Sequence, residues 1–182
     1  MKKLLIFIMV IASLSGKDDL QKIFHTGKSS AKLLIKTLGK EMKSYMKNGD
    51  IKGAVEFCSG NAYILTDEVS KKLGKNISVK RISTKYRNPA NKPTKTEAKM
   101  LFMLENNKSP LLTRVSNHEY KFYKPLRIGK PVCLKCHGKG FDMPEIARKT
   151  IHNLYPNDKA TGYEFGDLRG AIVVTIKTEE KK

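Results

Sequence analysis

Hydrophobic residues recur at intervals of three and four along residues 18–47, and this spacing predicts one long amphipathic helix. The Asn-Gly-Asp stretch that follows ends the pattern. Asp50 is a favourable N-cap for a second helix, which we expect to run to about Leu73 and to end at Gly74. The apolar stripe of this second helix includes Cys58, so its thiol is expected to face the core.

The second half of the chain has the shorter pattern of β-strands. Prolines in residues 86–93 exclude regular structure there. A capping-box sequence at Thr94 and Glu97 predicts the start of a further helix, and Pro144 predicts the start of another. Helices dominate the first part and strands the second, with few strand–helix–strand units, which predicts an α+β fold with an antiparallel sheet. The predicted strands cover residues 77–84, 111–116, 119–126 and 170–177.

The N-terminus has the pattern of an export signal. Lys2 and Lys3 precede an uncharged apolar run over residues 4–12, and small residues follow it. The run is too short to span a bilayer as a mature helix. We therefore expect residues 1–16 to be a signal peptide, or a membrane anchor if it is not cleaved, and residues 17–182 to form one periplasmic domain.

The chain is strongly basic, because 36 lysines and arginines outnumber 17 acidic residues and give a formal net charge of +19. The lysines are scattered, and no basic run is interleaved with aromatic residues, so nucleic-acid binding is not expected. An acidic redox or signalling protein, or an anionic membrane surface, fits this charge better.

Cys133, Cys136 and His137 form the attachment signature of a c-type haem. The two thiols add to the porphyrin vinyl groups, and the histidine ligates the iron. Zinc would need a second pair of ligands, which the sequence lacks. A thioredoxin-like redox pair lies early in a strand–helix–strand unit, whereas this pair lies late, in a segment rich in glycine and proline that we expect to be a loop. The predicted cofactor is one covalent haem c.

Cys58 is the one cysteine not needed for attachment, and it is a candidate for the second iron ligand. A thiolate there would favour ferric iron and lower the reduction potential. The alternative is a small buried hydrophobic residue, the commoner role of a lone cysteine. Arg81 and Arg87 either bind a haem propionate, since guanidinium groups pair well with carboxylates, or are surface cations. Weaker candidates for the iron are His25, Met103, His118, Met143 and His152, and candidates for lining the haem are Phe57, Tyr86 and Tyr123.

Several segments resemble, in the same order, a haem-c-binding family with a PAS-like fold. This family occurs as stand-alone periplasmic proteins and as the extracytoplasmic sensing part of kinases and chemotaxis-type receptors. The resemblance implies a five-stranded antiparallel sheet that carries the haem, and an iron-ligating cysteine opposite the CxxCH histidine, here Cys58 and His137. The Arg-Asn-Pro-x-Asn-x-Pro loop and the late CxxCH are its most specific parts. The matching segments are residues 54–59, 79–83, 86–93, 123–126, 133–138, 155–163 and 166–171.

Three classes of function are compatible with a haem held in this way. A sensing module would report redox state, or a diatomic gas such as NO or CO, to a partner, and the resemblance favours this class. An electron carrier would dock on acidic partners, and the basic charge fits it. An enzyme such as a peroxidase needs an open iron face, which a Cys58 ligand would close. We therefore expect a redox or small-ligand sensor, with electron transfer as the alternative and catalysis as the least expected class.

Overall fold

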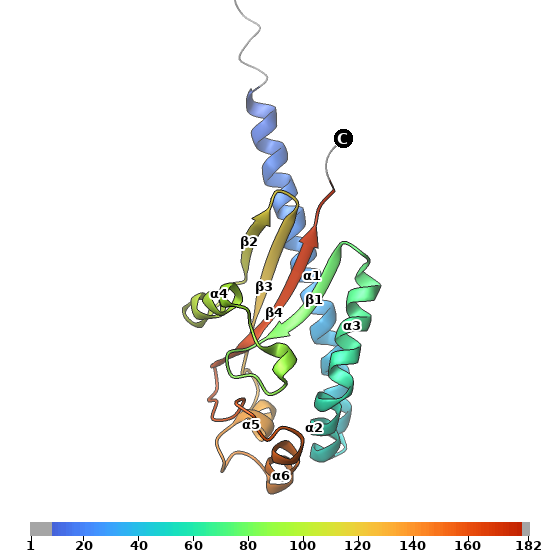
Figure 1. The fold of residues 1–182 in the computed structure, drawn as a ribbon, viewed down its shortest axis with the longest axis vertical. Coiled ribbons are helices and arrows are strands. Elements are labelled where there is room, and N and C mark those ends of the chain that lie inside the picture. The colour runs from blue at the N-terminus through green and yellow to red at the C-terminus, as the bar shows by residue number, and fades with distance from the viewer. Residues whose placement is uncertain (1–8, 180–182) are drawn as a thin grey trace, which may run out of the picture.

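The computed structural model describes residues 9–179, with side chains from residue 19 onward. It combines helices with an antiparallel sheet, so the predicted α+β class is confirmed (Figure 1). In chain order the elements are α1 (Met9–Lys47), α2 (Ile51–Ser59), α3 (Asn61–Leu73), β1 (Ile77–Ile82), the 3-10 turn η1 (Pro89–Asn91), α4 (Lys95–Asn106), β2 (Leu111–Ser116), β3 (Glu119–Arg127), α5 (Pro131–His137), α6 (Glu145–Leu154) and β4 (Leu168–Lys177).

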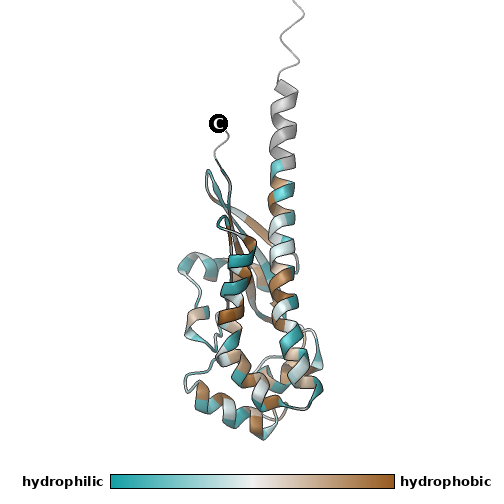
Figure 2. Ribbon diagram, turned by 90° about the vertical axis from the view of Figure 1, so that its right-hand side faces the viewer, coloured by the Kyte–Doolittle hydropathy of each residue, from teal (hydrophilic) through white to brown (hydrophobic). Residues whose placement is uncertain are grey.

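The sheet has the strand order β1-β4-β3-β2, and each neighbouring pair is antiparallel. Side chains of Ile172, Val174 and Ile176 alternate along β4 with those of Ala171 and Val173, so the two sets point to opposite faces. The first set packs against α1 and α3, and the second packs against α4. Figure 1 shows α1 behind the sheet, and in Figure 2 hydrophobic and polar residues alternate along α1 and α3. Both faces of the sheet are thus covered by helices.

Beyond one end of the sheet lie α2, α5 and α6, and α6 packs against both α2 and α5 (Figure 1). Val55 of α2 packs against Ala147 and Ile151 of α6. The cysteine-bearing helix α5 lies against a second small cluster. That cluster consists of Ile128, Ala160 and Tyr163, with Cys133 and Leu134 packed on it.

The sheet has four strands in the described residues, which corrects the five implied by the family resemblance. Between β1 and α4 the chain forms η1 within its proline-containing loop, and prolines lack the N–H groups that a further strand would need. The PAS-like character of the fold stays a prediction.

Three helices also differ from those expected. The first helix, α1, begins at Met9 instead of residue 18. The second helix is divided at Gly60 into α2 and α3, and glycine has a low helix propensity. Cys133 and Cys136 lie in the short helix α5 instead of a loop, since Pro131 suits the first turn of a helix as well as a loop.

The predicted signal peptide over residues 1–16 lies partly outside the described residues. α1 begins at Met9, and no helix in the described part is long and apolar enough to cross a membrane. Cleavage, export and the single domain over residues 17–182 stay predictions.

Gly27 lies on the buried side of α1, where the helix passes close to the ring of Phe122 in β3. A methyl group at this position would collide with that ring, so we expect Gly27→Ala to lower the free energy of unfolding by about 1–3 kcal/mol in urea titrations. Gly39→Ala is the matched control on the same helix, since nothing lies within 4 Å of its added methyl. The control should be neutral or stabilise by about 0.5–1 kcal/mol. Equal losses in the two variants would contradict the steric explanation.

Glu97 in the first turn of α4 is fully buried although it is charged. Its carboxylate accepts the Thr94 N–H at 3.0 Å and pairs with Lys80 at 2.8 Å and Lys121 at 3.6 Å. Burial acts to raise the pKa of Glu97, but the bonds from Lys80 and Thr94 and the charges of both lysines outweigh it. The pKa of Glu97 therefore lies below its usual 4.5.

A pKa that is lowered by folding makes the contribution of Glu97 dependent on pH. Its carboxylate stabilises the fold above about pH 4.5, and this contribution is lost as the pH falls through the folded-state pKa. We expect Glu97→Gln to cost about 1–3 kcal/mol of unfolding free energy near neutral pH and less in acid. Glu105→Gln, an exposed carboxylate on the same helix, is the control and should change little. A Glu97→Gln cost that does not shrink in acid would count against this assignment.

Candidate functional site

One cavity of about 720 Å³ is lined by the C-terminal half of α1 and by α2 and α5. Its volume is typical of small-molecule sites, which span about 300–1,000 Å³. All three cysteines of the chain line it, and so do His137, Arg81 and Arg87. The structure thus brings the principal candidates from the sequence together. The other lining residues are Gly39, Met42, Lys43, Met46, Lys47, Ala54, Val55, Asn88, Asn91, Lys130, Val132, Tyr155 and Arg169.

The ends of α5 determine how its cysteines face this cavity. Pro131 occupies the first turn, where the missing N–H has no intrahelical partner to lose. Gly138 ends the helix, and its N–H donates to the Leu134 carbonyl at 2.8 Å. Cys133 and Cys136 are three positions apart, so they are neighbours on one side of the helix. Both thiols can therefore reach the same ligand.

His137 is held by a backbone carbonyl. Its Nδ1 lies 2.8 Å from the carbonyl oxygen of Ala160, and its ring meets Tyr163 edge-on. Because a carbonyl can only accept, Nδ1 carries the proton and Nε2 keeps a free lone pair, an arrangement common to metal-binding histidines. Burial, and then the charges of Arg169 and Arg87, lower the pKa of His137 well below its usual 6.5. The ring is therefore neutral, which is the form that binds a metal.

Arg87 ties the end of α5 to the segment that carries Ala160. Its Nε and Nη2 donate to the two carboxylate oxygens of Asp158 at 3.1 and 3.0 Å, and Nη2 also donates to the Cys136 carbonyl at 2.7 Å. The paired side chains are only 8% and 9% exposed. A propionate contact from Arg87, as expected from the sequence, would have to compete with these bonds.

Two other arginines, Arg81 and Arg169, line the cavity. The Nε atoms of Arg81 and Arg169 are buried and have no hydrogen-bond partner in the described part of the chain. Arg169 is fixed by a bond from Nη1 to Ser83 Oγ at 2.9 Å. No aspartate or glutamate is among the described lining residues. The wall therefore suits a ligand that carries carboxylates, and the two propionates of a haem meet this requirement.

Cys58 lines the cavity from α2, whereas His137 belongs to α5. The Cys58 Sγ lies 3.5 Å from Sδ of Met42 on α1, and the Tyr155 hydroxyl donates to the Cys58 carbonyl at 3.3 Å. Burial raises the pKa of the Cys58 thiol, and the charges of the three nearby arginines oppose this rise. A bound metal cation would favour the thiolate further.

The weaker candidates lie elsewhere, since none of them lines this cavity within the described residues. Met103 is exposed on α4, and Met143 packs between α2 and α6. Tyr123 is buried in the cluster beneath α4, and Phe57 stacks on Tyr45. The others are His25 on α1, His118 between β2 and β3, His152 on α6 and Tyr86 before η1.

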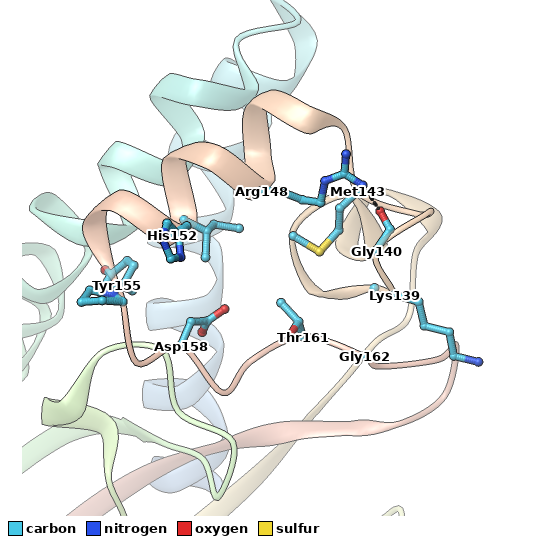
Figure 3. Close-up of a pocket in the computed structure, with 12 residues that line it drawn as sticks. Lys139, Gly140, Met143, Arg148, His152, Tyr155, Asp158, Thr161 and Gly162 are labelled. Atoms are coloured by element: carbon cyan, nitrogen blue, oxygen red, sulfur yellow. Dashed lines mark hydrogen bonds between the residues drawn. The ribbon is translucent and has the colours of Figure 1, made fainter.

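A second cavity of about 490 Å³ lies beside α6 and the loop that follows α5 (Figure 3). Across it, Arg148 donates from Nη1 to the Gly140 carbonyl at 2.7 Å, the dashed line in Figure 3. Asp158 lines this cavity and also binds Arg87, while Tyr155 lines both cavities. No cysteine is among its described lining residues, so the thiol chemistry belongs to the first cavity.

Comparison with known proteins finds a matching family model and a similar solved structure. The model of the Tll0287-like family matches residues 28–177, a range that contains the whole lining of the first cavity. The fold is similar to the crystal structure of the cyanobacterial heme-protein Tll0287, with a TM-score of 0.62 and 24% sequence identity over 91% of this chain and 98% of that one. No curated protein matches the chain. The family model carries the name of this solved protein, which is described as a heme-protein, so the family resemblance that the sequence indicates is confirmed. The chain belongs to the Tll0287-like family.

Proposed function

We propose that this chain is an exported c-type haem protein that acts as a redox or small-ligand sensing module. The observation that carries the proposal is the shared cavity, in which Cys133, Cys136 and His137 lie on α5 and Cys58 lies on α2. The likeness in fold to a protein described as a heme-protein supports it.

Different cavity residues would bind different parts of the haem. Cys133 and Cys136 would form the two thioethers, and Nε2 of His137 would ligate the iron, with Nδ1 fixed by the Ala160 carbonyl. Cys58 would supply a second protein ligand to the iron. A bound haem would supply one-electron redox chemistry, and binding of diatomic molecules where a protein ligand is released.

The sequence indicates Arg81 and Arg87 for the propionates, and we propose Arg81 and Arg169 in their place. Arg81 and Arg169 line the cavity, and the Nε of each is buried without a hydrogen-bond partner among the described residues. Arg87 is engaged by Asp158 and the Cys136 carbonyl, so we assign it to positioning α5. Paired guanidinium–carboxylate bonds would then orient the group within the cavity.

Electron transfer is the second candidate. Exposed Lys43, Lys47 and Lys130 line the same cavity and would attract an acidic redox partner. Catalysis is disfavoured, because two protein ligands would leave no open iron position for a substrate.

Mass spectrometry tests whether the group is covalently attached. The protein should be produced in a periplasm that contains the haem-attachment machinery, and its intact mass should rise by that of one haem. Cys133→Ser combined with Cys136→Ser should abolish the increase. Cys58→Ala is the matched control, because it removes a thiol from the same cavity and should keep the increase. A bare polypeptide mass for the unmodified chain would refute the proposal.

Kinetics separate the sensor from the carrier. Fast electron exchange with a soluble acidic donor protein, with a rate that falls steeply with salt, would favour the carrier. Slow exchange, with binding of CO or NO in competition with Cys58, would favour the sensor.

A further inference from the structure

We propose that Met42 is a second, redox-selected iron ligand, which replaces Cys58 when the iron is reduced. This inference rests on the proposed haem function and names how that site would respond to redox state. It starts from the contact between the two sulfurs, because Sδ of Met42 lies 3.5 Å from Sγ of Cys58 and both residues line the same cavity.

The two sulfurs come from different helices that are held firmly together. α1 ends at Lys47 and α2 begins at Ile51, and the Asp50 N–H donates to the Tyr45 carbonyl at 3.0 Å across this turn. The rings of Tyr45 and Phe57 pack on each other beside it. The relative position of the Met42 and Cys58 backbones is therefore fixed by the fold.

Methionine suits such an exchange. Its unbranched side chain has three rotatable bonds, so rotations alone can move its sulfur by the short separation of 3.5 Å. Met42 is only partly buried and faces the cavity, so no core packing has to be broken. The exchange would need no movement of α1 or α2.

The ligand preference of the iron in each oxidation state determines the direction of the exchange. An anionic thiolate donates charge and favours ferric iron, whereas a neutral thioether paired with histidine favours ferrous iron and raises the reduction potential. The cavity places the thiol of Cys58 and the thioether of Met42 in contact with each other. Each oxidation state would therefore select a different sulfur.

The exchange balances as follows. An external one-electron donor reduces the ferric iron to ferrous. The bond from iron to Cys58 Sγ breaks, the electron pair stays on the sulfur, and the resulting thiolate takes up one proton from water. A lone pair of Met42 Sδ forms the new bond to the iron. Re-oxidation by an external one-electron acceptor reverses each change.

The test compares Met42→Leu with Met46→Leu in the haem-loaded protein. Leucine conserves the volume of methionine, so both variants should fold. Met46 lines the same cavity one helical turn further along α1 and is the matched control. The measurements are absorption spectra before and after reduction with dithionite, the reduction potential, and NMR of methionine labelled at its methyl carbon.

We expect all ferric spectra to be the same, with a thiolate signature. In the reduced unmodified protein and in Met46→Leu, one methionine methyl should be shifted far upfield by the porphyrin ring current. Met42→Leu should lose this signal and change its reduced absorption spectrum. It should stabilise the ferrous state relative to the ferric state at least tenfold less, which lowers the reduction potential by about 59 mV or more.

Two negative results have different meanings. If haem is attached and the ferric iron carries a thiolate, but Met42→Leu leaves the reduced spectrum and the potential unchanged, then Met42 only packs against Cys58 and this inference is wrong. If no haem is attached, or if the ferric spectrum lacks a thiolate signature, the proposed function fails first.

Discussion

Replacing Arg87 by alanine is expected to lower the free energy of unfolding by about 3–5 kcal/mol, because the change leaves the buried carboxylate of Asp158 without its partner. The Cys136 carbonyl would lose its donor as well. The segment that carries Ala160 would then be less firmly held against α5, so the orientation of His137 should loosen too. Urea unfolding gives the first effect, and broadened or heterogeneous haem spectra would give the second.

A double-mutant cycle separates this explanation from a direct propionate contact. If the pair with Asp158 carries the energy, Asp158→Asn should also be costly, and the combined change should cost clearly less than the sum of the two. Arg114→Ala, an exposed arginine on β2, is the control and should stay within about 0.5 kcal/mol. Additive losses from Arg87 and Asp158 would instead place the role of Arg87 outside this ion pair.

Local signals in the sequence predicted most of the fold. Asp50 caps α2 by accepting the Gly53 N–H at 2.7 Å, and Gly74 ends α3 with a φ of 89°, as the pattern indicated. Such signals act within a few residues, so they can be read without tertiary structure. The incorrect fifth strand had no such local signal, because only the family resemblance implied it and no pattern in this chain predicted it. The break at Gly60 was missed because glycine within a helical pattern is often tolerated.

Site residues could be predicted where reactive side chains follow each other at a spacing known from other proteins. Cys133, Cys136 and His137 are such a case, and the structure places them at one cavity. Arg169 and Met42 were not singled out, because only the packing of β4 and α1 around the cavity brings them there. The hydrogen bond between His137 and the Ala160 carbonyl could not be predicted from the sequence, since every residue has a carbonyl. Long-range backbone contacts of this kind can be identified only from the structure.

Cys58→Ala is expected to raise the reduction potential of the loaded protein by on the order of 100 mV, because an axial thiolate stabilises ferric iron and axial ligands tune haem potentials over several hundred millivolts. The ferric absorption and EPR signatures of thiolate ligation should vanish, while the covalent haem remains. Redox titration and EPR of the unmodified and variant proteins measure both effects.

Val55→Ala is the matched control, because Val55 lies on the same helix, is buried and lines the same cavity without a sulfur. It should reduce stability by leaving a small cavity, yet keep the thiolate signature and change the potential much less. If Cys58→Ala behaves like Val55→Ala, Cys58 is only a small apolar side chain against Met42. Since Cys58 is the one cysteine outside the CxxCH motif, this result would remove thiolate ligation from the proposal and leave His137 as the proposed iron ligand.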